Sequence, residues 1–241
     1  MHRWGSRIFV KVNAPAVVRR ELARRSWRGE YVAVGTVTDP YQPLEGRYRL
    51  TRGILQAFAD YDTPVGIISR SPLVVRDRDV LAQLARNAGA SVSISIATLD
   101  EAVAREIEPT VAPPRQRLRA VSALAAAGIR VNVALAPVVP HVTDAPASLE
   151  AVVRAARDAG AANVWHSTLY LHDVTREAFF AYLRDRRPEL LPRYERMYPG
   201  KYAPYSVTSI IDRNVGTALR SHAPRELPRI TARGPRQISL L

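Results

Sequence analysis

The stretch VAVGTVTDPYQPLEGRYRLTRGIL, residues 32–55, begins as an apolar strand, stops in small polar residues and resumes as a helix. Its second part, TDP, is a strong turn signal, and apolar residues return at helical spacing from about residue 48. A strand, a polar loop and a helix in this order make up the first part of a β-α-β unit. The stretch therefore indicates an α/β fold with parallel strands.

The same alternation of strands and helices continues along most of the chain. After a helix over residues 14–25, the pattern predicts strands at 31–37, 64–69, 91–97, 129–139 and 163–171, and helices at 48–61, 77–87, 115–127, 148–159 and 176–186. Repeated units of this kind predict a parallel sheet with right-handed crossovers, either closed toward a barrel or open and doubly wound. In both architectures the chemistry is expected at the carboxyl ends of the strands.

Composition limits the classes of function that the chain can have. With 35 Lys and Arg against 22 Asp and Glu, its formal net charge is +13, which favours polyanions such as nucleic acid, although an arginine-rich composition also fits coding bias. No G-x-G-x-x-G or P-loop motif follows a strand, which argues against a Rossmann oxidoreductase or a P-loop enzyme. No segment is apolar over the length of a bilayer, so we expect a cytoplasmic protein with no membrane partner.

Polar side chains lie at or just after the carboxyl end of each predicted strand. Among them are Thr36, Thr38, Asp39, Gln42 and Glu45, then Ser69, Arg70 and Ser71, then Ser93 and Ser95, then His141, and finally His166. Hydroxyl groups, carboxylates and an arginine suit a polar ligand that has amino, carboxylate and ribose groups. Each also has a structural interpretation, because Ser and Thr cap helices and Asp39-Pro40 is an ordinary turn.

Five segments together carry a resemblance to a known family: VKVNAPAVVRREL (10–22), SWRGEYVAVGTVTDPYQPLEGRYRLTRGIL (26–55), TPVGIISRSPLVVRD (63–77), VSISIATLDEAVAREIEP (92–109) and AGIRVNVALAPVVPHVTD (127–144). In their order and spacing they resemble the radical S-adenosylmethionine (radical SAM) superfamily, in the branch related to spore photoproduct lyase. The resemblance implies a partial (β/α)6 TIM-like barrel of parallel strands over residues 1–215, without its first strand and cluster loop. Residues 216–241 are then expected to form a flexible tail rich in Pro and Arg.

The resemblance also implies a SAM site built from the strand ends. In that family the loop after the second barrel strand meets the amino group of SAM, a role that would fall to Thr36, Thr38 and Asp39. Gln42 and Glu45 would shape this loop.

Three further strands would complete the predicted site. Arg70, within Ser69-Arg70-Ser71, would face the SAM carboxylate, where family members usually have a lysine. Ser95, or Ser93 two positions earlier on the same face, would contact the ribose or methionyl part. Pro137 would lie against the adenine.

The cluster-binding cysteines of the family are the main departure from its pattern. Members hold a [4Fe–4S] cluster through three cysteines spaced C-x3-C-x2-C, and this chain has no cysteine. The expectation is that the cluster segment is missing and that these residues alone neither ligate the cluster nor cleave SAM. We predict no metal ligands in this chain.

Three functions follow as hypotheses. The first is a truncated radical SAM enzyme that abstracts hydrogen from an unknown substrate, with nucleic acid compatible. The second is a cluster-free protein that binds SAM or another nucleoside. The third is an unrelated barrel hydrolase that uses Asp39 with His141 or His166. A barrel opened by a lost first strand is also expected to self-associate through its unpaired edge, and Tyr194 and Tyr198 are expected in the core.

Overall fold

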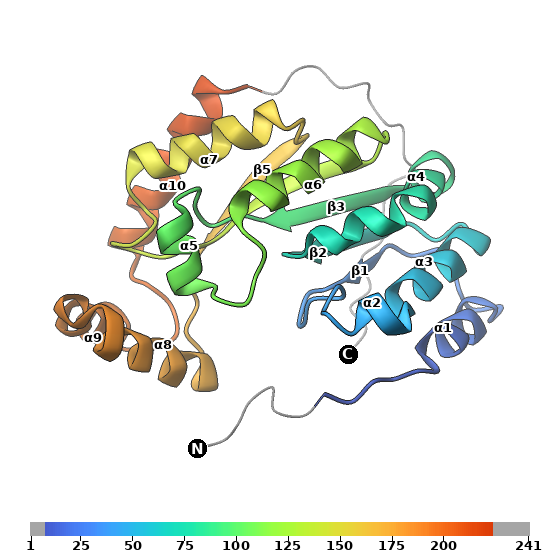
Figure 1. Ribbon diagram of the computed structural model, residues 1–241, viewed down its shortest axis with the longest axis horizontal. Coiled ribbons are helices and arrows are strands. Elements are labelled where there is room, and N and C mark those ends of the chain that lie inside the picture. The colour runs from blue at the N-terminus through green and yellow to red at the C-terminus, as the bar shows by residue number, and fades with distance from the viewer. Residues whose placement is uncertain (1–7, 224–241) are drawn as a thin grey trace.

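Five parallel strands form one sheet in the order β1-β2-β3-β4-β5 (Figure 1). The structure is a computed structural model that describes residues 8–223. The strands are β1 (Val32–Val34), β2 (Val65–Ser69), β3 (Ala90–Ser95), β4 (Arg130–Val138) and β5 (Asn163–Thr168). Every neighbour in the sheet is also the neighbour in sequence, which is the order of strands in a (β/α) barrel. The α/β fold of parallel strands that the sequence predicts is confirmed.

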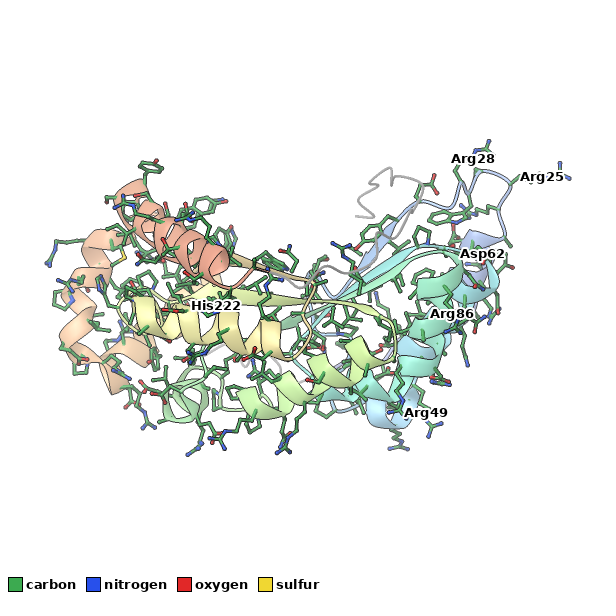
Figure 2. All side chains as sticks on the ribbon, turned by 90° about the horizontal axis from the view of Figure 1, so that it is seen from above. Arg25, Arg28, Arg49, Asp62, Arg86 and His222 are labelled. Atoms are coloured by element: carbon green, nitrogen blue, oxygen red, sulfur yellow. The ribbon has the colours of Figure 1, made fainter. Side chains whose placement is uncertain are left out.

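Helices connect successive strands and leave the sheet open. The connecting helices are α2 (Glu45–Tyr48), α3 (Leu50–Asp60), α4 (Arg78–Asn87), α5 (Glu101–Ile107), α6 (Pro114–Ala126) and α7 (Pro146–Asp158), with the 3-10 helix η1 (Pro72–Asp77) before α4. Helix α1 (Ala14–Leu22) precedes β1 and packs on α3. In the view from above, α6 and α7 lie on the same side of the sheet (Figure 2).

The two faces of the sheet differ in chemistry. Toward the helices, Ile67, Ile94 and Val133 are at most 1 % exposed and belong to one hydrophobic cluster. The opposite face carries small and polar residues, where Ser93 lies in register with Asn132 and accepts a hydrogen bond from its Nδ2 at 3.5 Å. Period-two alternation of side chains produces this difference, since the helices can cover only one face.

A second hydrophobic cluster lies beyond β5, among α8 (Asp173–Arg186), the 3-10 helix η2 (Pro188–Leu190) and α9 (Leu191–Met197). Tyr194 and Tyr198 are both fully buried here, with ring centroids 5.5 Å apart and planes within 4° of parallel. Their hydroxyl groups donate to the carbonyl oxygens of Pro140 and Leu169, at 2.6 and 2.9 Å. The predicted core position of the two tyrosines is confirmed.

Several boundaries differ from those the sequence predicts. The helix predicted at 48–61 is divided by Arg49, whose φ of 50° is left-handed, into α2 and α3. Helices α5 and α10 (Tyr205–Ser221) are not predicted, and α9 is indicated only by the helical spacing of Tyr194 and Tyr198. The tail predicted from residue 216 overlaps the last turns of α10, and residues 224–241 lie outside the described residues. Between residues 8 and 223, no helix combines the length and hydropathy that crossing a membrane requires.

Candidate functional site

A cavity of about 790 Å³ opens at the carboxyl ends of β1, β2 and β3. Six of the predicted site residues line it: Thr36, Thr38, Asp39, Gln42, Arg70 and Ser95. Ile8 and Phe9 add an apolar wall that the sequence does not predict, because nothing in its local pattern shows that residues before α1 return to this edge. The cavity is therefore where strand order brings the polar strand ends together.

The loop after β1 is tied to the end of β2 by Asp39. The Asp39 carboxylate accepts three hydrogen bonds, from the backbone N–H of Tyr41 at 2.9 Å, from Ser69 Oγ at 2.8 Å and from the backbone N–H of Arg70 at 2.7 Å. Two of these reach Oδ1 and one reaches Oδ2. Since a carboxylate offers about four acceptor positions, Asp39 keeps capacity on Oδ2 for a ligand.

Gly35 allows this loop to leave β1. Its φ is +97°, and a Cβ atom at this position would lie 2.2 Å from the carbonyl oxygen of Ile68 and 2.9 Å from Pro40 Cδ. Only glycine combines the left-handed backbone with such a close approach to the neighbouring strand. The glycine in GTVTDP thus has a specific structural cause.

Arg70 is held at the cavity from the other side. Its Nη1 lies 3.3 Å from Glu108 Oε1, and Glu108 Oε2 accepts from Arg117 Nη2 at 2.7 Å. Arg117 is 1 % exposed and also donates to the carbonyl oxygens of Ser95 and Ala112, at 2.9 and 2.6 Å. The side chain of Arg70 is about half exposed, and the guanidinium has further N–H groups that can donate to a ligand.

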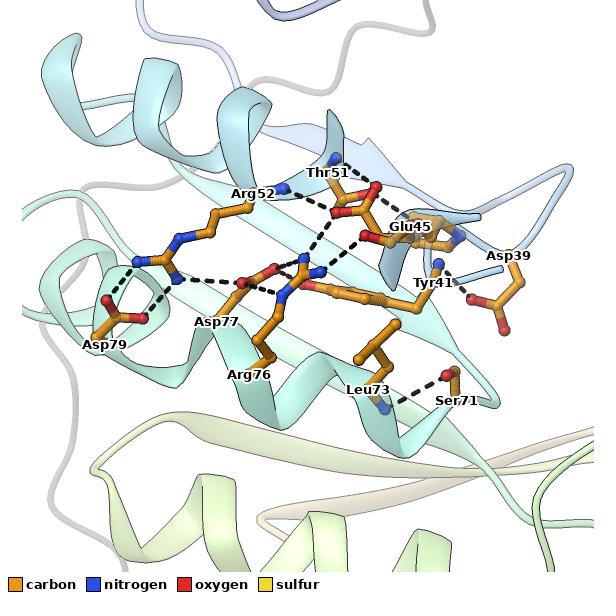
Figure 3. Close-up of polar contacts among 11 residues, drawn as sticks. Asp39, Tyr41, Glu45, Thr51, Arg52, Ser71, Leu73, Arg76, Asp77 and Asp79 are labelled. Carbon is orange, nitrogen blue, oxygen red and sulfur yellow. Dashed lines mark hydrogen bonds and ion pairs between the residues drawn. The ribbon is translucent and has the colours of Figure 1, made fainter. Parts of the chain in front are cut away.

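A buried polar network supports the loop after β1 (Figure 3). Glu45 is 5 % exposed and accepts from the backbone N–H of Thr51 at 3.0 Å and from Arg76 Nη2 at 2.7 Å. Fully buried Asp77 accepts from Arg76 and from the Tyr41 hydroxyl at 3.1 Å. Burial, followed by the charge of Asp77, raises the pKa of Tyr41 well above its usual value.

Four predicted residues do not line the cavity. The Ser71 side chain caps η1 by accepting from the backbone N–H of Leu73 at 3.3 Å. Ser93 lies one pleat before Ser95 on the same face of β3. Pro137 sits at the irregular register of β4, where the absence of an N–H group is tolerated. Glu45 belongs to the supporting network and does not line the cavity either.

The histidines lie elsewhere. His166 Nε2 is 2.8 Å from Asp212 Oδ1 on α10, and His166 does not line the cavity that contains Asp39. His141 has a φ of 62° in an exposed turn, and its backbone N–H donates to Asp144. No histidine is among the described residues that line the cavity. The arrangement gives the hydrolase hypothesis no support.

The cavity brings opposite charges together. The carboxylate of Asp39, the guanidinium of Arg70 and the hydroxyl groups of Thr36, Thr38 and Ser95 suit a zwitterion with a hydroxylated part. These residues fit the methionyl and ribose groups of SAM. They do not fit an iron–sulfur cluster, because the 241 residues include no cysteine, and within 8–223 no group of three or more His, Asp or Glu could hold a metal.

Relatives of this chain include proteins from bacteria and from an archaeal virus. The uncharacterized protein Rv2578c of Mycobacterium tuberculosis is 38 % identical over 218 residues, which cover 90 % of this chain and 64 % of the relative. The uncharacterized protein ORF301 of Acidianus two-tailed virus is 29 % identical over 177 residues, which cover 72 % of this chain and 57 % of that protein. The chain thus spans less than two thirds of the length of these relatives.

Solved structures share the fold. A spore photoproduct lyase variant with bound AdoMet and dinucleoside spore photoproduct aligns with a TM-score of 0.67 at 14 % identity, over 90 % of this chain and 66 % of that chain. At this identity the likeness concerns the fold alone. The model of the radical SAM superfamily matches residues 4–150, which is more than half of the 241 residues. This chain therefore belongs to the radical SAM superfamily.

Proposed function

We propose that this chain supplies the SAM-binding part of a radical SAM protein. The observation that carries the proposal is the cavity in which Asp39 and Arg70 present opposite charges beside the end of β3. A free α-amino acid group has an ammonium group that pairs with a carboxylate and a carboxylate group that pairs with a guanidinium. The methionyl part of SAM contains both of these charged groups.

Each lining residue then has a role in binding. Asp39, with Thr36 and Thr38, accepts hydrogen bonds from the SAM ammonium group, and Gln42 shapes the loop. Arg70 binds the SAM carboxylate, and Ser95 contacts the ribose or methionyl part. Contacts with Ser71, Ser93 or Pro137 require a ligand that extends beyond the lining residues.

Reductive cleavage of SAM in this superfamily uses a [4Fe–4S] cluster held by thiolates. These 241 residues contain no cysteine, so any cluster must be ligated by residues outside them. A cluster-free SAM or nucleoside binding protein is the second candidate function, and the same absence of cysteine favours it. The two candidates share the cavity and differ only in whether a C-x3-C-x2-C segment accompanies it.

Calorimetric titration of the iron-free chain with SAM tests the proposal. We expect saturable binding of SAM, weaker binding of adenosine, which lacks both charged groups, and weaker binding of methionine, which lacks the nucleoside. Absence of heat and of a shift in melting temperature with SAM would contradict it. Translation of the DNA upstream of the Met1 codon separates the two candidates: C-x3-C-x2-C in frame favours the enzyme, and its absence in every frame favours the cluster-free protein.

For the substrate we propose nucleic acid as the chemical class. The formal net charge of +13 supports this, because a basic protein gains affinity for phosphates by counterion release. The structure with the related fold named above contains a dinucleoside spore photoproduct. Hydrogen abstraction from such a substrate would require the complete protein.

A further inference from the structure

Three exposed aromatic rings gather where the chain leaves β5. The rings of Tyr170 and His172 are 5.9 Å apart with planes 13° from parallel, and those of Tyr170 and Tyr202 are 5.0 Å apart. Tyr202 is 66 % exposed and Tyr170 is 42 % exposed. Rings that contact one another yet remain open to solvent are suited to bind a further flat group, since aromatic side chains gain most when a partner covers them. We name Tyr170, His172 and Tyr202 the aromatic shelf.

Backbone contacts hold the shelf in place. Tyr170 and Tyr202 pair in an isolated antiparallel bridge, and the N–H of Leu171 donates to the carbonyl oxygen of Lys201 at 2.9 Å. Leu171 itself is fully buried in the second hydrophobic cluster. The rings therefore lie on two segments that are fixed to each other and to the core. The conformational entropy that these segments lose when a ligand binds is accordingly small.

Positive charge lies directly beside the rings. A cavity of about 430 Å³ adjoins them, and its lining includes His172, Arg176 and Lys201. Lys201 is one of only two lysines in the chain, and its ammonium nitrogen lies 5.8 Å from the centre of the Tyr202 ring. Asp173 is the carboxylate that lines this cavity, and it pairs with His172 Nδ1 at 2.7 Å.

We infer that the aromatic shelf binds single-stranded nucleic acid, with bases stacked on its rings and phosphates near Lys201 and Arg176. Stacking on aromatic rings beside cations is how proteins hold single strands, because every base has a flat π face and every linkage a negative charge. The shelf follows the carboxyl end of β5, and this is the same edge of the sheet as the SAM cavity. The inference rests on the proposed function only in treating this strand as the substrate.

Fluorescence anisotropy with a labelled oligo(dT) of about 12 nucleotides tests the inference. Tyr202→Ala is expected to weaken binding about tenfold or more, while Tyr202→Phe, which keeps the ring, binds like the unmodified chain. Tyr61→Ala is the matched control, because Tyr61 is 39 % exposed at the end of α3 and is expected to change nothing. Lys201→Gln is expected to reduce the slope of log affinity against log salt by about 0.7, with Arg25→Gln as its control.

Titration of the same variants with SAM separates this inference from the proposed function. Tyr202→Ala should bind SAM with unchanged affinity, which also shows that the variant is folded. If Tyr202→Ala binds the oligonucleotide as well as the unmodified chain does, or if Tyr61→Ala loses equally, the shelf is not the binding surface. Undiminished binding of Tyr202→Ala together with full competition by inorganic polyphosphate would reduce the interaction to charge alone and overturn the inference. Failure of SAM binding with intact oligonucleotide binding would contradict only the proposed function.

Discussion

At the scale of single residues, Gly35 has the most exacting position in the loop after β1. Its backbone is left-handed, and the carbonyl oxygen of Ile68 occupies the space that a side chain would need. Gly35→Ala is expected to lower the free energy of unfolding by about 1–3 kcal/mol, measured in urea. Gly46→Ala is the control, because no atom lies within 4 Å of its added Cβ and alanine favours helix α2 by about 0.5–1 kcal/mol. Equal stability of the unmodified chain and the Gly35→Ala variant would contradict the close approach.

Asp39 joins the loop to β2 and, as proposed, meets the SAM ammonium group. In Asp39→Asn only one oxygen accepts, so the amide cannot satisfy both the N–H of Arg70 and the contacts at Oδ1. We expect the affinity for SAM to fall about 10- to 100-fold, as for loss of a charge-assisted hydrogen bond. The measurement is calorimetric titration. Asp62→Asn, at an exposed left-handed position that asparagine accepts, should leave the affinity unchanged, and an equal affinity of both variants would remove Asp39 from the site.

The chemistry of the strand ends predicts a polar site that includes Asp39, and the resemblance to the radical SAM superfamily predicts the role of each residue in it. Polar residues at strand ends could be placed at one edge because parallel strands carry their carboxyl ends there. Ser71 is a helix cap because η1 begins directly after it. Ser93 is buried and does not line the cavity because it lies two residues before Ser95 on β3. Neither follows from spacing, because the local pattern of a cap and of a ligand contact is the same.

At the scale of elements, Arg117 connects α6 to the end of β3 and to α5. Its guanidinium is buried and reaches Glu108, which in turn reaches Arg70. Arg117→Met would leave Glu108, whose side chain is 9 % exposed, without its closest cation. We expect a loss of about 3–5 kcal/mol in the free energy of unfolding. Arg115→Met on the same helix, where the arginine side chain is 80 % exposed, should change it by less than about 0.5 kcal/mol.

If the folded Arg117→Met variant binds SAM more weakly than the unmodified chain does, Arg117 also positions Arg70. Titration with SAM at a temperature where the Arg117→Met variant is folded provides this measurement. Unchanged affinity would limit Arg117 to a structural role. Unchanged stability would contradict its buried pairing with Glu108.

Helix α8 is joined to α5 through Glu106. Arg187 donates to both carboxylate oxygens of Glu106, at 2.7 and 2.8 Å. These hydrogen bonds, and to a smaller extent the one from the Tyr182 hydroxyl, lower the pKa of Glu106 to about 2, although burial of the carboxyl group acts in the opposite direction. Because the folded pKa lies below the unfolded one, the stabilisation is present above about pH 4.5 and is lost as pH falls toward 2. Partial exposure of the pair limits it to about 1–2 kcal/mol.

The test compares the unmodified chain with Glu106→Gln in urea at several pH values. At pH 6 the unmodified chain should be the more stable, and the difference should shrink steadily below pH 4.5. Glu177→Gln, which changes an exposed residue of α8, should show no such pH-dependent difference. A difference that stays constant with pH would show that the charge of Glu106 does not stabilise this contact.

Element types with strong periodicity were predicted well, and weakly patterned ones were not. The strands of the sheet all emerge from apolar runs, as does α6 from its alternation of Ala and Leu. Helix α5 was missed because EAVAREI is short and mixed in polarity, and its start depends on the Asp100 side chain, which accepts from the backbone N–H groups of Ala102 and Val103. Helix α10 was missed because its apolar residues pack on α7, a tertiary contact that no local pattern shows.

At the scale of the whole molecule, the fold consists of the sheet with its covering helices and of the second hydrophobic cluster beyond β5. Strand order and the apolar face of the sheet are set by the repeated β-α-β pattern, so the sequence predicts them. The second hydrophobic cluster beyond β5 depends on how α8 and α9 return to the loops after β4 and β5. Only its tyrosines could be assigned to a core in advance, because their spacing marks one helical face.

The open sheet leads to a prediction about association. Among residues 8–223, β1 is the first strand of the sheet and pairs with β2, and Val37 beside it is 93 % exposed. Such an edge is a template for pairing with a second chain. Light scattering across a range of concentrations should show self-association that Ala33→Lys reduces, since a charge on an edge strand opposes pairing. Ala126→Lys adds the same charge on exposed α6 and should have no effect. A single monomer peak at every concentration, with one cooperative melting transition, would show that the edge is protected.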